Sequence, residues 1–221
     1  MIAPPVELHV VIRVIEVADV AATARMHRAA LAGGFFVGLG DRFMRGYHRT
    51  FVTSPAGIGL VAERNGQIIG FVTGTVDEAT HYRHVVRRDR WALGARGAMA
   101  LAARPAEFVR FVRTRAFRYA RGIVRLSRGP LPAAGGGRKK RGVLSHLVVA
   151  EAERGCGVGA VLLCAFEDTA RAQGARDLRL VASGDNHRAH AFYERSGWVR
   201  GDEDRDVDGG VWMSFVRSVE R

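Results

Sequence analysis

The sequence predicts a mixed α/β fold, because strand-like and helix-like patterns alternate along the chain. The apolar run Val143–Val149 leads through a glycine-rich turn, residues 154–159, into the helical pattern Val158–Ala172. A second strand-to-helix unit follows between Leu178 and Gly197. Earlier in the chain, Asn65-Gly66 separates two apolar stretches in the way that is typical of a β-hairpin. Alternation of this kind is typical of mixed α/β proteins.

The first part of the chain predicts a strand, two helices and this hairpin. Residues 8–17 form an apolar-rich strand, and residues 19–32 carry Val20, Ala24, His27 and Leu31 at helical spacing. Residues 41–52 predict a second helix, with Phe43, Met44, Tyr47 and Phe51 on one side. The hairpin strands are Gly59–Arg64 and Gln67–Val76.

The turn from Arg154 to Gly159 is a candidate site for a phosphorylated ligand. The first N–H groups of a helix have no partner within the helix, its dipole adds positive charge there, and glycines let an anion approach the main chain. A dinucleotide site is excluded, because the third glycine of G-x-G-x-x-G is missing and the strand Leu178–Ala182 ends without a carboxylate. A Walker loop is excluded because no G-K-S/T follows.

The next unit supplies a second motif. Asp185-Asn186 predicts a helix N-cap, Ala189, Phe192 and Tyr193 follow at helical spacing, and Gly197 predicts the stop. With the glycine turn, the chain resembles the GNAT superfamily of acyl-CoA-dependent N-acyltransferases. The superfamily's R/Q-x-x-G-x-G/A turn is matched from Arg154 to Gly159, and its N-x-x-A-x-x-F-Y-E-x-x-G-F pattern begins at Asn186, with Trp198 replacing the last Phe. The resemblance covers about residues 6–77 and 142–217.

The resemblance implies a central mixed, mostly antiparallel β-sheet flanked by helices. It also implies transfer of an acyl group, most commonly acetyl, from the pantetheine thioester of acyl-CoA to an amine by direct attack. Acetyl-CoA or another acyl-CoA is then the co-substrate, and no metal is needed. The expected partner is a small-molecule amine acceptor, but its identity stays open, since a small amine, an aminosugar, an antibiotic and a protein N-terminus all fit. The residues that the resemblance places against acyl-CoA are Val148, Val149, Arg154, Gly155, Cys156, Gly157, Val158, Gly159, Ala160, Asn186 and Tyr193.

Acyl transfer to an amine needs donors for the oxyanion, a general acid and a general base, and the resemblance implies residues for the first two. Main-chain N–H groups near Val148 and Val149 would hold the oxyanion, and Tyr193 would protonate the leaving thiolate, for which a phenol with a pKa near 10 is suited. Phe35, Phe36, Tyr47 and His48 are implied as candidates for the wall of the acceptor pocket.

The general base stays open at this point. Where relatives often carry Glu or His, this chain has Val143 and Ser145, and neither is a strong base. A water relayed by Ser145 is one option. His146 is another, although strand alternation sends it to the opposite face from Ser145 unless a bulge intervenes. The remaining candidates are carboxylates: Glu63, Asp77 and an acidic loop at residues 202–208.

Charge is unevenly distributed along the chain. The net charge is +12, but residues 80–141 alone carry +15 and the remainder −3. Within this segment, residues 106–126 predict an amphipathic helix with arginines opposite its apolar side. We therefore expect three parts: residues 1–77, a basic helical insertion at 78–141, and residues 142–221. One interpretation is that the arginines reflect the codon bias of a GC-rich genome and are simply solvated. The other is that they bind an acidic carrier protein, a tRNA or an anionic membrane surface.

Composition sets further limits. Two cysteines cannot build a disulfide framework or a structural zinc site, and Cys164 is expected to be a small core thiol. No run approaches the length of a membrane span and the N-terminus does not read as a signal peptide, so a cytoplasmic protein is expected. The oligomeric state stays open, a dimer included. A non-catalytic CoA-binding module is the remaining alternative, and the intact Asn186 and Tyr193 argue against it.

Overall fold

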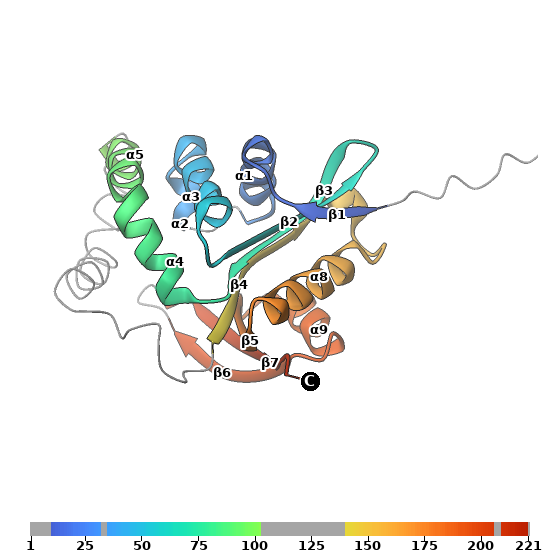
Figure 1. Cartoon of the computed structure of the whole chain (residues 1–221). Coiled ribbons are helices and arrows are strands. Elements are labelled where there is room, and N and C mark those ends of the chain that lie inside the picture. Colours follow the sequence, from blue (N-terminus) through green and yellow to red (C-terminus); the bar gives the residue numbers. More distant parts are fainter. Residues whose placement is uncertain (1–9, 32–34, 103–139, 206–208, 221) are drawn as a thin grey trace, which may run out of the picture.

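The computed structural model describes residues 10–31, 35–102, 140–205 and 209–220. Within these ranges the chain forms a seven-stranded sheet in the order β1-β2-β3-β4-β5-β7-β6. Helices α1 and α3 cover one face, and α8 and α9 cover the other (Figure 1). Neighbouring strands pair antiparallel except β4 and β5, which are parallel. The expected mixed α/β architecture with a mostly antiparallel sheet is confirmed.

The first half of the chain builds one edge of the sheet and the α1/α3 layer. Its elements are β1 (Val11–Val14), η1 (Val17–Asp19), α1 (Val20–Ala30), α2 (Phe35–Gly38), α3 (Asp41–Thr53), β2 (Gly57–Arg64) and β3 (Gln67–Thr75). The β2–β3 turn has positive φ at both Asn65 (51°) and Gly66 (74°), as a two-residue type I′ hairpin requires. The short helix α2 was not expected from the sequence.

Three helical segments follow β3. Asp77 caps α4 (Glu78–His84) by accepting the N–H of Thr80 at 3.1 Å, and a π-helical turn, η2 (Val85–Asp89), continues into α5 (Arg90–Ala102). The amphipathic helix expected at residues 106–126 lies outside the described residues. The division into residues 1–77, 78–141 and 142–221 therefore stays a prediction.

The second half supplies β4 (Lys140–Val149), η4 (Glu151–Glu153), α8 (Val158–Ala172), β5 (Ala175–Ser183), α9 (His187–Arg195), β6 (Val199–Arg205) and β7 (Val211–Ser218). Two expectations were wrong here. Residues 202–205 belong to strand β6, because they pair with β7, and only residues 206–208 of the expected loop lie outside the described part. Cys164 is exposed, because the buried side of α8 runs through Leu162, Leu163 and Phe166 instead.

The sheet opens between β4 and β5, and this opening positions the site. The two strands pair only from Lys140 to Val143 and from Ala175 to Arg179. Beyond those residues β4 stays with β3 as far as Val149, and β5 stays with β7 as far as Ser183. A bulge lies where the strands part: Thr73 faces His146 and Gly74 faces Leu144, so Ser145 is the extra residue of β4. A bulge bends the strand that carries it.

Candidate active site

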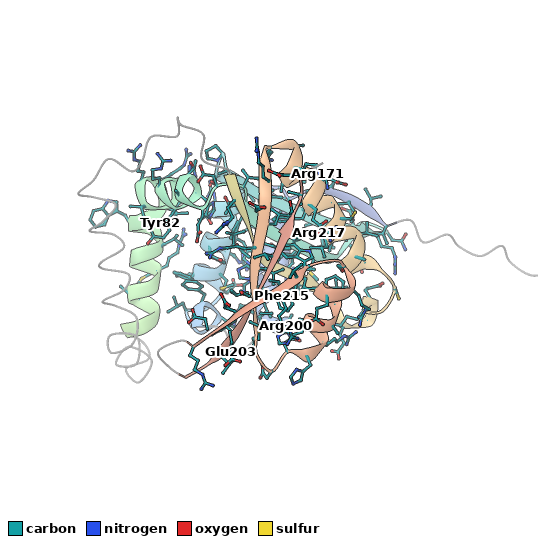
Figure 2. All side chains as sticks on the ribbon, turned by 90° about the horizontal axis from the view of Figure 1, so that it is seen from below. Tyr82, Arg171, Arg200, Glu203, Phe215 and Arg217 are labelled. Carbon is teal, nitrogen blue, oxygen red and sulfur yellow. The ribbon has the colours of Figure 1, made fainter. Side chains whose placement is uncertain are left out.

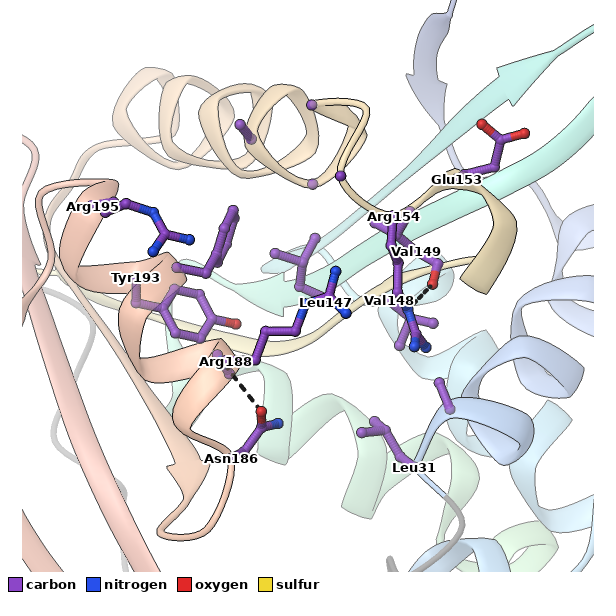
Figure 3. A pocket seen from close by; sticks show the side chains of 17 residues that line it. Leu31, Leu147, Val148, Val149, Glu153, Arg154, Asn186, Arg188, Tyr193 and Arg195 are labelled. Carbon is purple, nitrogen blue, oxygen red and sulfur yellow. Dashed lines mark hydrogen bonds between the residues drawn. The ribbon is translucent and has the colours of Figure 1, made fainter.

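A cavity of about 540 Å³ lies between the end of β4, the glycine turn and α9, and it reaches the end of α1 (Figure 3). It lies where β4 and β5 part, so that no strand of the described residues pairs with this edge of β4 beyond Val143. The lining residues are Ala30, Leu31, Leu147, Val148, Val149, Glu153, Arg154, Gly155, Gly157, Gly159, Ala160, Asn186, Arg188, Ala189, Phe192, Tyr193 and Arg195.

The glycine turn presents main-chain donors to this cavity. Gly155 (φ 86°) and Gly157 (φ 81°) adopt the left-handed conformation that L side chains disfavour. Gly157 is the N-cap of α8, and its carbonyl accepts the N–H groups of Ala160 at 3.0 Å and Val161 at 3.1 Å. The preceding N–H groups belong to the first helical turn, where the helix offers them no partner. They are thus placed to bind an anion.

Arginines add charge to the same cavity. Arg154 donates from Nε to the carbonyl of Val149 at 3.3 Å, and Arg188 projects from α9 into the space facing the turn (Figure 3). Arg195 lies about two helical turns further along α9 and also lines the cavity. Main-chain donors at a helix start together with guanidinium groups fit a ligand that bears several phosphates, such as the diphosphate of CoA.

Helix α9 brings a phenol to the opposite wall. Asn186 caps the helix, its Oδ1 accepting the N–H of Ala189 at 3.1 Å. Tyr193 is 8% exposed, and its hydroxyl points into the cavity (Figure 3). Burial raises the pKa of Tyr193 to about 12, because an apolar environment disfavours the phenolate. The hydroxyl therefore keeps its proton near neutral pH and can donate it.

Most residues that the sequence suggested for acyl-CoA come together here. Nine of them line the cavity, whereas Cys156 is exposed outside the lining and Val158 is only 2% exposed, its side chain packed in the core. Sequence reasoning missed the other eight lining residues, which are Ala30, Leu31, Leu147, Glu153, Ala189, Arg188, Phe192 and Arg195. The last three could have been found, because their spacings of four and three place them on one side of a helix with Asn186 at its cap.

His146 lies on the α1/α3 face, together with the groups that surround it. Its Nε2 is 2.8 Å from the hydroxyl of Tyr47, and its ring centroid is 4.3 Å from that of His27. The bulge at Ser145 produces this placement, since it puts Leu144 and Leu147 toward α8 and His146 toward α1 and α3. Burial, with His27 and His48 nearby, lowers the pKa of His146 well below its ordinary value of 6.5.

The carboxylates suggested as bases do not line the cavity. Glu63 pairs with Arg13 at 2.8 Å, and Asp77 caps α4. Although burial raises the pKa of Asp77, hydrogen bonds from Thr80 bring it below its ordinary value overall. Glu203 lies on the exposed strand β6, which forms the edge of the sheet (Figure 2).

The expected acceptor-wall residues fall into two groups. Phe36 and Tyr47 are half-buried, with ring centroids 5.2 Å apart, whereas His48 is fully buried. The side chain of Phe35 lies outside the described part.

In the described ranges, no helix is long and apolar enough to cross a membrane. Across the same residues, no three His, Cys, Asp or Glu side chains come close enough together to hold a metal ion.

Comparisons with known proteins agree with this architecture. The family model described as "Acetyltransferase (GNAT) family" matches residues 31–198. One similar solved structure is the ribosomal-protein-S18-alanine N-acetyltransferase of Escherichia coli, with 13% identity, 96% of each chain covered and a TM-score of 0.58. A second is the ribosomal-protein-alanine N-acetyltransferase of Brucella melitensis, with 16% identity, 94% of this chain and 99% of that chain covered and a TM-score of 0.58. A third is yncA of Salmonella typhimurium, solved with acetyl-CoA, with 15% identity, 96% of this chain and 95% of that chain covered and a TM-score of 0.56. At these identities the likeness shows the fold. A search among curated proteins finds no match.

Proposed function

Because this chain belongs to the GNAT family of acetyltransferases, we propose that it transfers the acetyl group of acetyl-CoA to the nitrogen of an amine. One observation carries the proposal. The cavity at the opening between β4 and β5 has an anion-binding helix start on one wall and the hydroxyl of Tyr193 on another. A phosphate-bearing donor and a proton donor for its leaving group are thus accommodated in one cavity.

The glycine turn and the arginines would hold the donor by its phosphates. The free edge of β4 offers main-chain N–H and C=O groups to its extended pantetheine arm, as an added strand would be held. Bound in this way, acetyl-CoA supplies an activated acyl group in thioester linkage. N–H groups at Val148 or Val149 would stabilise negative charge that develops on the carbonyl oxygen.

Tyr193 would act as the general acid. Its hydroxyl proton passes to the departing sulfur as the carbon–sulfur bond breaks, and solvent later restores the proton. The amine must also lose a proton as its nitrogen attacks, and Ser145 and His146 are the proposed groups of β4 on that path. General acid–base groups typically contribute about 10²–10⁴ in rate.

A carrier-bound donor is the second candidate. The observation that favours it is the net charge of +15 over residues 80–141, which suits an acidic carrier protein or an aminoacyl-tRNA. Slow transfer from free acetyl-CoA together with rapid transfer from a loaded carrier protein or an aminoacyl-tRNA would favour this alternative. Acetyl-CoA binding without transfer to any amine would instead identify a non-catalytic module.

The test combines binding with a panel of acceptors. Calorimetry measures the affinity for acetyl-CoA. CoA analogues that lack the thiol sulfur or one phosphate group are the controls, and weaker binding of the analogue without the phosphate would show that the phosphates contribute to affinity. Release of the free thiol is then followed with small amines, aminosugars, lysine peptides and peptides that begin with alanine, since two similar structures are alanine N-acetyltransferases. Thiol release that depends on one class of amine is the expected result. A folded protein with no affinity for acetyl-CoA would contradict the proposal.

A further inference from the structure

Three histidines and a tyrosine from three elements, α1, α3 and β4, meet on the α1/α3 face of the sheet. His27 of α1 and His48 of α3 are joined through Nδ1 and Nε2 at 3.0 Å, and His146 of β4 and Tyr47 of α3 through Nε2 and the hydroxyl at 2.8 Å. The two pairs pack on each other, the ring of His27 lying 4.3 Å from that of His146. We call these four residues the histidine cluster.

The histidine cluster adjoins the cavity along two elements. On β4, His146 directly precedes Leu147, which begins the lining, and on α1, His27 lies one turn before Ala30 and Leu31, which close the lining. Tyr47 and His146 are half-buried, whereas His27 and His48 are almost fully buried. We call Tyr47 and His146 the outer pair, and His27 and His48 the inner pair. None of the four lines the cavity itself, but Val148 does, and it lies two residues after His146 on the same face of β4.

Packing alone does not explain this choice of residues. Nδ1 of His48 and Oγ1 of Thr73 are both buried without a hydrogen-bond partner in the described part of the chain. Thr73 lies on β3, directly opposite His146 of β4. A buried polar atom without a partner loses the hydrogen bonds that it makes to water in the unfolded chain, a cost that apolar side chains of the same shape would avoid. Such groups are rare in native proteins, and a catalytic role is one of the explanations for them.

The hydrogen bonds also indicate where the protons lie. A bare ring nitrogen is less costly to bury than an N–H without an acceptor, so Nδ1 of His48 carries no proton and its Nε2–H donates to Nδ1 of His27. In the outer pair, the proton transfer proposed below requires the phenolic O–H of Tyr47 to donate to Nε2 of His146, whose own proton then lies on Nδ1.

Resting on the proposed acetyl transfer, we propose that Tyr47 receives the proton of the attacking amine and passes its own proton to Nε2 of His146. As the nitrogen bonds to the acyl carbon it becomes positively charged, and its N–H bond breaks toward the Tyr47 oxygen. The O–H bond of Tyr47 breaks as an N–H bond forms on His146, which later releases the proton to solvent. The carbon–sulfur bond breaks with the proton from Tyr193, so no further reactant is needed.

His27 and His48 act in this scheme as positioning residues. Other titratable groups near His146 are few: His27 faces it from α1, Tyr47 and His48 from α3, and His81 of α4 lies behind Phe51, on which it stacks at 4.9 Å. Any charge on these neighbours would oppose a proton on His146. Burial lowers the pKa of His27 to about 4 and that of His48 to about 3, so both are neutral near neutral pH.

The first experiment is Tyr47→Phe, which keeps the ring and removes only the hydroxyl. We expect kcat to fall about 100-fold, while the affinity for CoA measured by calorimetry and the unfolding midpoint stay as in the parent. Tyr82→Phe is the matched control, because Tyr82 is also half-buried but lies on α4 (Figure 2), an element that contributes no residue to the histidine cluster. It should leave kcat unchanged.

The second experiment reads protonation without turnover. His48→Gln removes the hydrogen bond that holds the ring of His27 against His146, so the titration midpoint of the ¹⁵N signal of His146 should change, and the acid limb of the kcat/KM profile should move in the same direction. His84→Gln, on α4, should move neither. Unchanged titration of His146 in His48→Gln overturns the positioning role.

The outcomes separate this inference from the proposed function. Full turnover in Tyr47→Phe alongside a large loss in Tyr193→Phe overturns the role of Tyr47 and leaves acetyl transfer standing. No thiol release by the parent with any amine defeats acetyl transfer itself, and the proton path with it. Loss in Tyr47→Phe but not in Tyr82→Phe supports both.

Discussion

Burial sets the protonation of the reacting side chains at the scale of single residues. It raises the pKa of Tyr193 to about 12 and lowers that of His146 well below 6.5. Both shifts have the same physical origin, since a poorly solvated side chain favours its neutral form. Near neutral pH the proposed acid therefore holds its proton and the proposed acceptor lacks one, which is the state that the reaction needs at the start.

Replacing Tyr193 by Phe tests the acid. The ring and its packing against Trp198 and Phe215 remain, and only the hydroxyl is lost. We expect kcat to fall by about 10²–10⁴ with unchanged affinity for CoA. Steady-state kinetics with the acceptor found in the panel and calorimetry with CoA give the two numbers. A variant that turns over normally would leave Tyr193 as a core residue.

Among the elements, the start of α8 depends on backbone conformation rather than on space. A Cβ at Gly157 would touch nothing within 4 Å, but its φ of 81° is strained for an L residue, so Gly157→Ala should cost about 1–2 kcal/mol in unfolding free energy. The turn would also relax, and acetyl-CoA should bind more weakly. Urea unfolding and calorimetry measure both effects.

Gly159 provides the control for this turn. It lies within α8, and a Cβ there would meet Val149 at 3.6 Å and Phe192 at 3.7 Å, which are ordinary contacts. Gly159→Ala should therefore fold as stably as the parent. Equal stability losses in the two variants would show that the left-handed conformation at Gly157 is not what matters.

A buried carboxylate ties α8 to β7 and to the start of β6. Glu167 accepts Nε1–H of Trp198 at 2.8 Å and pairs with Nε of Arg217 at 2.9 Å. Its side chain is only 7% exposed, so Glu167→Ala should lower the unfolding free energy by about 3 kcal/mol, since Arg217 and the indole N–H lose their partner. Asp168→Ala removes the neighbouring carboxylate, 62% exposed and paired with Arg171, and should cost less than about 1 kcal/mol. Similar losses would contradict the argument.

For the whole molecule, the buried histidines predict acid sensitivity. The pKa values of His27, His48 and His81 fall to about 4, 3 and 4, below the 6.5 of the unfolded chain. The unfolded state then binds more protons, so stability is complete above about pH 6.5 and falls as the pH drops toward 4. At about pH 5 each such histidine should cost about 2 kcal/mol.

Urea unfolding between about pH 7 and pH 5 measures this loss. In the double variant His27→Gln, His48→Gln the slope of stability against pH should be shallower than in the parent, because two of the depressed groups are gone. An identical slope would assign the acid sensitivity to other groups.

Much of the fold could be read from the sequence, because local signals and tertiary structure agree there. Asn65-Gly66 fixed a hairpin turn, and Asn186 and Gly197 marked the ends of α9. Residues 202–205 were assigned to a loop instead of a strand, because their charged side chains carry no apolar alternation. Every residue of β6 is exposed, and only pairing with β7 makes it a strand. Cys164 was misplaced because its apolar neighbours on α8 surround it in the sequence but not in space.

The sequence by itself determined the two motifs, the glycine turn and the α9 cap, because each is a local pattern of backbone conformation and helix ends. From these followed the family, the fold and most of the cavity lining. Only the tertiary structure decided which residues stand near the proton path. Tyr47 and His146 are 99 positions apart, and their contact at 2.8 Å arises because one extra residue at Ser145 changes the face to which His146 points. A bulge is a property of two paired strands, and no pattern within β4 alone encodes it.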